Sequence, residues 1–297
     1  MIGFLNVYKP QGMTSFDAVR KIKRQVKPEK VGHLGTLDPM AEGILPIAIG
    51  HGTRLIEYIT DTTKTYRTTM VCGGISDTQD CWGTITPLEE TAPASRETIE
   101  QVLSQFRGYI EQIPPMYSAV HHEGKRLYEL ARQGITVERP ARTVCISRLE
   151  LLGISQDEAG KQEISLRVEC SEGTYIRTLC HDIGQKLGSG AYMKQLVRER
   201  WGAFSLQNAI PLEEAAENWQ QHLLDPLQVL HDLPSYLLQS EENQQAIWFG
   251  NAIPCPEDFP EGKQVLLIKP DGTLAAIAGK QQGKTGGWEV QPYKVFK

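Results

Sequence analysis

The segment Gly32–Gly43 constrains the N-terminal part of this chain more than any other stretch. It contains three glycines, a histidine and the pair Asp38-Pro39 within twelve residues. Asp followed by Pro is typical of a helix start, because the aspartate caps the first turn and proline fits its first position. Gly43 and Pro46 would end such a helix within two turns. The segment therefore predicts either a very short capped helix or a loop that presents an ionised Asp38 as a nucleophile or base.

Length and composition indicate a folded chain of ordinary character. The 297 residues are 40% hydrophobic and 23% charged, which excludes a disordered or fibrous chain. The longest apolar run, at residues 43–50, is too short to span a membrane. The first nine residues lack the basic and apolar regions of a signal peptide, so we expect a cytoplasmic protein with no membrane partner.

The cysteines and histidines do not form a metal-binding pattern. None of the six cysteines has C-x-x-C spacing, and the adjacent pair His121-His122 points its side chains apart on a helix or strand. We therefore expect reduced cysteines and no metal.

Charge is distributed unevenly along the chain. The formal net charge is −5, but residues 201–261 contain ten acids and no Lys or Arg. Net positive charge gathers in residues 1–54, 121–148, 177–200 and 262–297. Phosphate binding needs a local field rather than a basic whole protein, so these blocks could form one positive surface. Solvated helix faces are the alternative interpretation of the same blocks.

Hydrophobic periodicity predicts a mixture of helices and strands. Residues 16–27 predict a helix capped at Ser15, with Phe16 on its apolar face and Arg20, Lys21, Lys23 and Arg24 on the other. A second helix is expected at 95–106, and strands at 64–74, 143–152 and 163–170. Apolar runs on both sides of Asp271-Gly272 predict a hairpin in a small C-terminal β-domain.

Two further clusters pair an aromatic ring with a cation. They are Thr63–Arg67 and Ser171–Thr178, which contain Tyr66 and the pair Tyr175 and Arg177. Half-buried, hydrogen-bonded strand residues are one interpretation of such clusters. Stacking on a base combined with contact to a phosphate or carboxylate is the other.

Seven motifs in order resemble those of the TruB family of tRNA pseudouridine synthases, over about residues 3–230. They are Lys9-Pro-x-Gly-x-Thr-Ser15, Gly32-His-x-Gly-x-Leu-Asp-Pro39 with Ala41-x-Gly43, Lys64-x-Tyr66, Ser76-Asp-Thr-x-Asp80-x-x-Gly83, Pro114-Pro-x-Tyr-Ser-Ala119, Gly124-x-Arg-x-Tyr-x-x-Ala-Arg132 and Gly173-Thr-Tyr-Ile-Arg177. The resemblance implies an α+β fold. A catalytic domain around a mixed, largely antiparallel sheet would span 1–235, with an RNA-clamping thumb insertion at about 117–140. A PUA-like RNA-binding domain would span 236–297.

The resemblance also implies a reaction and a role for named residues. The enzyme would isomerise uridine 55 in the T-loop of tRNA, without cofactor or metal. Because the sequence contains no coiled-coil or obligate-interface pattern, we also expect a monomer. Asp38 falls on the catalytic aspartate, Arg177 on its arginine partner and Tyr66 on the tyrosine that stacks against the uracil. His33 falls on the histidine that enters the loop, and Tyr175 and Leu196 line the uridine pocket. The basic blocks supply the expected RNA contacts, which are Lys9, Arg20, Lys21, Lys23, Arg24, Lys125, Arg126 and Arg132.

Two other functions are compatible with parts of the same sequence. A tRNA-binding folding chaperone would use the basic surface and the β-domain without needing Asp38. A hydrolase could use Asp38 and Glu42 as an acid–base pair, although nothing in the sequence offers a sugar site.

Overall fold

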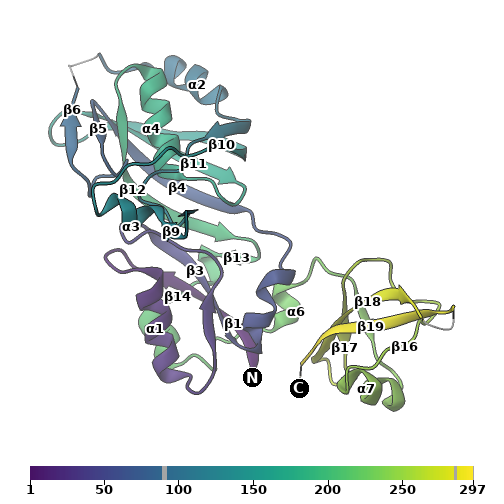
Figure 1. Cartoon of the computed structure of the whole chain (residues 1–297). Helices are drawn as coiled ribbons and strands as arrows, with labels where there is room; N and C mark the ends of the chain where they lie inside the picture. The colour runs from purple at the N-terminus through teal and green to yellow at the C-terminus, as the bar shows by residue number, and fades with distance from the viewer. Residues whose placement is uncertain (89–91, 284–285, 297) are drawn as a thin grey trace.

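The computed structural model describes residues 1–88, 92–283 and 286–296, and its two main sheets are drawn in Figure 1. Within these ranges, the larger sheet has ten strands. They are β1 (Ile2–Lys9), β2 (Val31–His33), β3 (Glu42–Gly50), β4 (Lys64–Cys72), β7 (Gly108–Gln112), β10 (Arg142–Gln156), β11 (Gln162–Cys170), β12 (Ala191–Trp201), β13 (Phe204–Ser205) and β14 (Ile210–Pro211). The strand order along the sheet is β14-β1-β3-β12-β4-β11-β10-β7, with β2 beside β3 and β13 beside β12.

Most neighbours in this sheet are antiparallel, and the parallel pairs are β1–β14 and β3–β12. The predicted mixed, largely antiparallel sheet of an α+β fold is confirmed. Two small hairpins accompany it, β5 (Gly74–Ser76) with β6 (Ile85–Pro87) and β8 (His121–His122) with β9 (Lys125–Arg126). The helices are α1 (Ser15–Gln25), α2 (Arg96–Ser104), α3 (Leu127–Ala131), α4 (Ile176–Leu187), α5 (Leu212–Glu217), α6 (Pro226–Val229) and α7 (Glu241–Trp248). Short 3₁₀ turns lie at η1 (His51–Arg54), η2 (Ile56–Tyr58) and η3 (Leu206–Asn208).

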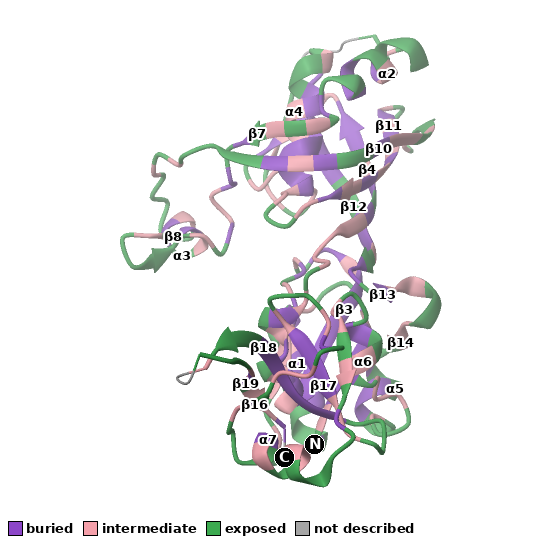
Figure 2. Ribbon diagram, turned by 90° about the vertical axis from the view of Figure 1, so that its right-hand side faces the viewer, coloured by how far each residue is buried: buried purple, intermediate pink, exposed green. Residues whose placement is uncertain are grey.

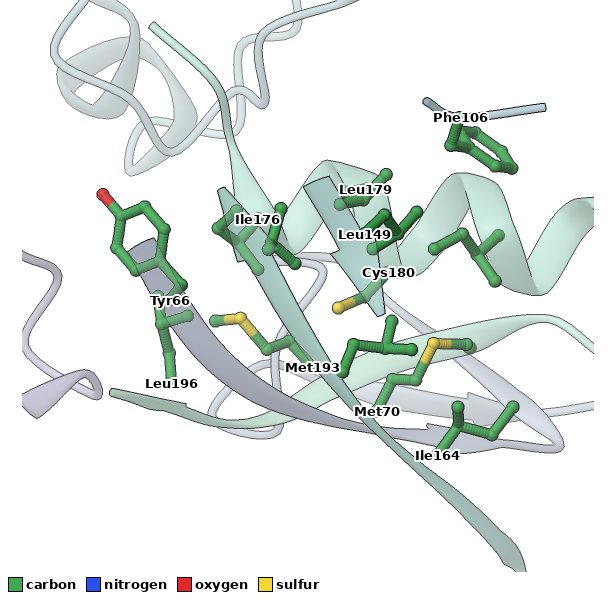
Figure 3. Close-up of a cluster of buried hydrophobic side chains, with 14 of the residues drawn as sticks. Tyr66, Met70, Phe106, Leu149, Ile164, Ile176, Leu179, Cys180, Met193 and Leu196 are labelled. Carbon is green, nitrogen blue, oxygen red and sulfur yellow. The ribbon is translucent and has the colours of Figure 1, made fainter. Parts of the chain in front are cut away.

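Helices α2 and α4 cover one part of the large sheet. Their apolar faces bury Ile99, Leu103, Leu179 and Ile183 against strands β4, β10, β11 and β12. Figure 3 shows part of this core, with Tyr66 at its edge and the tyrosine hydroxyl pointing away from the aliphatic side chains. The core therefore ends at an aromatic ring that has a polar tip.

Helix α1 differs from its prediction at its first turn. Thr14, not Ser15, caps the helix, through a reciprocal pair of hydrogen bonds with Asp17. Phe16 was expected on the apolar face but is 68% exposed, whereas Val19 and Ile22 are buried as expected. The shift of the cap by one residue leaves Ser15 buried and free to bond outside the helix.

The second sheet begins at Ser235, close to the predicted division of the chain. In the described residues its five strands are β15 (Ser235–Leu237), β16 (Ile253–Pro254), β17 (Val265–Ile268), β18 (Leu274–Gln282) and β19 (Trp288–Val295). Strands β17 and β18 form the predicted hairpin around Asp271-Gly272. Leu266, Ile277 and Phe296 pack in one cluster with Phe4 and Trp201, so this sheet shares a core with the large one.

The segment 117–140 leaves the large sheet between β7 and β10. It carries the β8–β9 hairpin and helix α3, and Figure 2 shows it projecting away from the sheet. Across the described residues, no helix is long and apolar enough to cross a bilayer.

Candidate active site

Asp38 lies in the loop between β2 and β3 and forms an ion pair with Arg177. The Arg177 Nε atom is 2.8 Å from Asp38 Oδ2, and the Asp38 side chain is 36% exposed. Arg177 belongs to the first turn of α4 and is 4% exposed. A buried guanidinium thus holds a carboxylate that solvent still reaches.

Arg177 has further partners that fix its orientation. Its Nη1 donates to the Thr78 carbonyl at 3.0 Å, and its Nη2 donates to the Tyr117 carbonyl at 2.8 Å. Asp80 Oδ2 lies 3.7 Å from the same Nη1. Asp80 is in turn held by Thr78 and the Trp82 amide. The role of Asp80 was not predicted, although the motif around it was recognised.

The loop that carries Asp38 is anchored by the segment that follows β1. Ser15 Oγ accepts a hydrogen bond from the Leu37 amide at 2.8 Å and donates to the Leu37 carbonyl at 3.0 Å. The Gly12 amide donates to the Pro39 carbonyl at 2.9 Å. These bonds hold the backbone on both sides of Asp38, which accounts for the Thr-Ser pair and the glycine in the first motif.

Gly43 lets β3 pass close to β12 directly after this loop. Its φ is +108°, a conformation that L side chains rarely adopt, and a Cβ atom there would collide with the Arg198 carbonyl oxygen. Asp38-Pro39 is followed by a turn, with the Ala41 amide bonded to the Asp38 carbonyl at 3.1 Å, rather than by an α-helix. The loop interpretation of this segment is therefore confirmed.

Tyr66 and Leu196 form the apolar wall beside Asp38. Tyr66 is 7% exposed on β4, and Leu196 is 5% exposed on the neighbouring β12. Figure 3 shows both at the same edge of the core. Burial raises the pKa of the Tyr66 hydroxyl, which therefore stays protonated at neutral pH. A protonated phenol beside a carboxylate suits stacking and hydrogen bonding rather than action as an anionic base.

His33 and Tyr175 are both partly exposed. His33 ends β2, and the Gly35 amide donates to its Nδ1 at 3.3 Å. Burial, and then the positive charge of Arg198, lower the pKa of His33 and favour a neutral ring. Tyr175 directly precedes α4, and both its backbone groups bond to the side chain of the buried Gln112. Gln112 was not singled out from the sequence.

Lys9 requires a correction, because it was expected to contact RNA. It is fully buried, and its Nζ donates to the carbonyls of Pro10 and Met13 at 2.9 Å each. Burial lowers the pKa of Lys9 to about 8, against the opposite influence of Asp38. The ammonium supports the turn beside the Asp38 loop and does not reach the surface.

The other predicted RNA contacts lie at or near the surface. Arg20, Lys23, Arg24, Lys125, Arg126 and Arg132 are exposed, and Lys21 is partly exposed in an ion pair with Glu213. The basic block 177–200 is not exposed throughout, because Arg198 in its β12 part is fully buried. Arg198 therefore cannot belong to the positive surface that the block 177–200 could have formed.

The carboxylate pair proposed for a hydrolase is not formed. Asp38 is bonded to Arg177, whereas Glu42 forms a hydrogen bond with Tyr8. In the described parts of the chain, no cluster of three or more His, Cys, Asp or Glu side chains could hold a metal ion.

Comparisons with known proteins match the whole chain. Residues 23–176 match the family model of the TruB family pseudouridylate synthase N-terminal domain, and residues 177–240 match that of the tRNA pseudouridylate synthase B C-terminal domain. The chain is 50% identical to the tRNA pseudouridine synthase B of Syntrophomonas wolfei, covering 100% of this chain and 99% of that protein. For the Heliobacterium modesticaldum protein of the same name, identity is 48%, with coverage of 99% and 95%.

The chain belongs to the TruB family of pseudouridylate synthases. It is therefore a pseudouridine synthase, an isomerase, as its motifs predicted. Its structure is also similar to a chain of a Cbf5-Nop10-Gar1 complex, with a TM-score of 0.71 and 27% identity, covering 99% of this chain and 85% of that one. An H/ACA RNP bound to a substrate RNA gives the same TM-score at 24% identity, which shows the shared fold. The preceding distances join four other TruB motifs to the Asp38 loop, through Ser15, through Arg177, and through the Thr78 and Tyr117 carbonyls that bond Arg177.

Proposed function

We propose that this TruB-family enzyme isomerises uridine 55 in the T-loop of tRNA to pseudouridine, with Asp38 as the catalytic nucleophile. The observation that carries the proposal is the 2.8 Å ion pair between Asp38 and the buried Arg177, at the edge of the Tyr66–Leu196 wall. Relatives named tRNA pseudouridine synthase B support tRNA as the substrate. The protein would then act as a monomer in the cytoplasm.

The chemistry requires a uracil to leave the base stack and enter the site. The C1′–N1 bond breaks, the uracil turns, and a C1′–C5 bond forms while the C5 proton is released to water. Base flipping costs a few kcal/mol, which stacking on Tyr66 would offset. His33 would occupy the space that the base vacates, and Tyr175 with Leu196 would border the uridine.

Asp38 is suited to attack because its carboxylate is oriented and remains accessible. Arg177 bonds one oxygen, Oδ2, through Nε, and among the described residues the second oxygen has no protein hydrogen-bond partner. That oxygen could attack C1′ of the ribose or add to C6 of the uracil. Either route ends with Asp38 released as a carboxylate, so no cofactor is consumed.

The exposed cations suit contact with the tRNA backbone. Helix α1 presents Arg20, Lys23 and Arg24, and the projecting thumb presents Lys125, Arg126 and Arg132. The acidic stretch 201–261 would face away from the RNA. Phosphate contacts of this kind supply affinity and salt dependence rather than chemistry.

The test uses a T-stem-loop RNA labelled with tritium at C5 of the target uridine. We expect wild type to release tritium to water with chelator present, and Asp38→Ala to release none while binding the RNA normally. Asp38→Asn in a tRNA refolding assay measures any chaperone activity separately. Tight tRNA binding by wild type without tritium release would contradict the proposal and favour the chaperone.

A further inference from the structure

Arg198 is a buried cation placed beside the catalytic loop. It lies on β12, is 0% exposed and is among the largest fully buried side chains of the molecule. Within the described ranges, no carboxylate lies within ion-pair distance of its guanidinium. A buried charge without a carboxylate partner needs several good hydrogen bonds. The hydrogen-bond partners of Arg198 therefore indicate its role in the structure.

The guanidinium bonds to backbone carbonyls on both sides of Asp38. Nη2 donates to the Gly35 carbonyl at 3.1 Å, and Nη1 donates to the Thr36 carbonyl at 3.2 Å. Nε donates to the Ile44 carbonyl at 2.7 Å. A planar guanidinium can serve three carbonyls in fixed directions, whereas a lysine ammonium cannot reproduce that geometry. One side chain thereby bonds the loop backbone before Asp38, at Gly35 and Thr36, and the β3 backbone after it, at Ile44.

Arg198 also lies beside Tyr66, which forms the apolar wall of the site together with Leu196. The two residues are directly opposite in the β12–β4 ladder. Burial raises the pKa of the Tyr66 hydroxyl, and the nearby charge of Arg198 opposes that rise. Arg198 therefore bonds to the Asp38 loop and lies opposite the tyrosine, while it reaches no solvent and can touch no substrate.

We propose that Arg198 is a positioning residue that sets the spacing between the Asp38 carboxylate and the Tyr66 ring. The inference rests on the proposed reaction, because that spacing matters only when a base lies between the two groups. Arg177 orients the Asp38 side chain, and Arg198 fixes the backbone that carries it. Loss of the three hydrogen bonds from the Arg198 guanidinium should therefore slow the chemical step without weakening RNA binding.

The test compares Arg198→Lys with Arg200→Lys, which is a matched control on the same strand. Arg200 also bonds a carbonyl and a carboxylate, those of Gly202 and Asp61, but neither partner belongs to the Asp38 loop. Arg198→Lys keeps the buried charge and avoids the cavity that a small residue would leave. Single-turnover tritium release and RNA affinity are measured for both variants on the T-stem-loop RNA.

We expect Arg198→Lys to lower the single-turnover rate about 100-fold, as a misplacement of roughly 1 Å does, with the RNA Kd within about threefold of wild type. Arg200→Lys should leave both values within about threefold, since its contacts are half-exposed. A wild-type rate in Arg198→Lys would overturn the proposal. So would a loss of RNA affinity as large as the loss of rate.

Hydrogen exchange separates positioning from general destabilisation and needs no RNA. In Arg198→Lys the amides of Leu37 and Ala41 should exchange faster, while those of β11 keep wild-type protection. Faster exchange throughout β4 and β11 would show a merely structural role and overturn the proposal. If wild type itself released no tritium, the proposed function would fail, and the exchange comparison would still decide whether Arg198 fixes the loop.

Discussion

The Asp38 loop and the thumb both contact Arg177, but they are held in opposite ways. The loop is bonded through its backbone by Ser15, Gly12 and Arg198. The thumb presents exposed cations, and Arg126 and Arg132 lie over the Tyr128 ring at 6.0 and 5.3 Å. Exposed cation–π contacts contribute about 0.5–1 kcal/mol, so they order a surface only weakly.

Under the proposed function, this difference separates the residues that act in the chemical step from those that bind the RNA. A carboxylate that must attack one carbon benefits from a backbone that does not move. A surface that must follow a folded RNA benefits from side chains that can adjust. The 2.8 Å bond from Arg177 Nη2 to the Tyr117 carbonyl joins the two regions at the base of the thumb. Substitutions on the two sides should therefore change different measured quantities.

The largest effect is expected for Arg177→Ala. It leaves Asp38 without its ion pair and removes the bond to Tyr117. Loss of a preorganised charged partner should lower single-turnover tritium release by at least about 10²–10³-fold. The RNA Kd should change little, because Arg177 is buried and acts on the carboxylate.

Two controls accompany this variant. Removing one partner of a buried pair costs about 3–5 kcal/mol of stability, so Arg177→Lys provides a milder change. Arg148→Ala removes an exposed arginine that pairs with Glu150 and should leave the rate unchanged. If Arg177→Ala weakened RNA binding and left the rate at saturating enzyme intact, the role assigned to Arg177 would be wrong.

The next effect is expected for Ser15→Ala. The hydroxyl holds both backbone groups of Leu37, and its loss leaves a buried amide and carbonyl unsatisfied. We expect a fall of about 1–3 kcal/mol in the free energy of unfolding, together with a slower single-turnover rate. Urea unfolding and tritium release measure the two quantities.

Ser104→Ala is the matched control for this comparison. Its hydroxyl donates to the Gln101 carbonyl at an exposed helix end, so its stability should change by less than about 0.5 kcal/mol. Equal effects of the two substitutions would show that the Ser15 bonds do not stabilise the loop.

Local sequence patterns predicted much of the fold. The segments 143–152 and 163–170, in which apolar and polar residues alternate, lie in the paired strands β10 and β11. The Asp271-Gly272 turn joins the β17–β18 hairpin. The prediction for the first turn of α1 was wrong because Thr14 and Ser15 are both good caps, and because Phe16 has the apolar character of a core residue. The reciprocal bonds between Thr14 and Asp17 favour Thr14 as the cap, and the bonds from Ser15 to Leu37 agree with that choice; hydrophobic periodicity contains neither.

The pairing of Asp38 with Arg177 was predictable from the motifs, although the two residues lie far apart in the chain. Lys9 was misread as an RNA contact, and Arg198 lies in a block that could have formed a positive surface, because a basic residue in a basic block predicts a surface cation. Both bond to backbone carbonyls, and a carbonyl partner leaves no signal in the sequence.

On the thumb side, Lys125→Gln should act on binding alone. Lys125 is exposed at the tip of the β8–β9 hairpin, so its removal should not alter stability or the rate at saturating enzyme. Loss of one phosphate contact should reduce the slope of log K against log salt by about 0.7–0.9. Fluorescence anisotropy at several salt concentrations measures the slope, and an unchanged slope would remove Lys125 from the RNA contact surface.

The smallest expected effect is a pH-dependent change in stability that comes from Lys9, which is buried beside the Asp38 loop. Burial lowers its pKa to about 8 in the folded protein, from an ordinary value of 10.5. Between these values the unfolded chain holds a proton that the folded protein has lost, so the free energy of unfolding rises with pH by at most about 1.4 kcal/mol per unit. Lys9→Met has no such group, so wild type should gain stability relative to Lys9→Met between pH 8 and 10. Urea unfolding across this range tests the difference, and parallel curves would mean that Lys9 is not held as a buried cation beside the Asp38 loop.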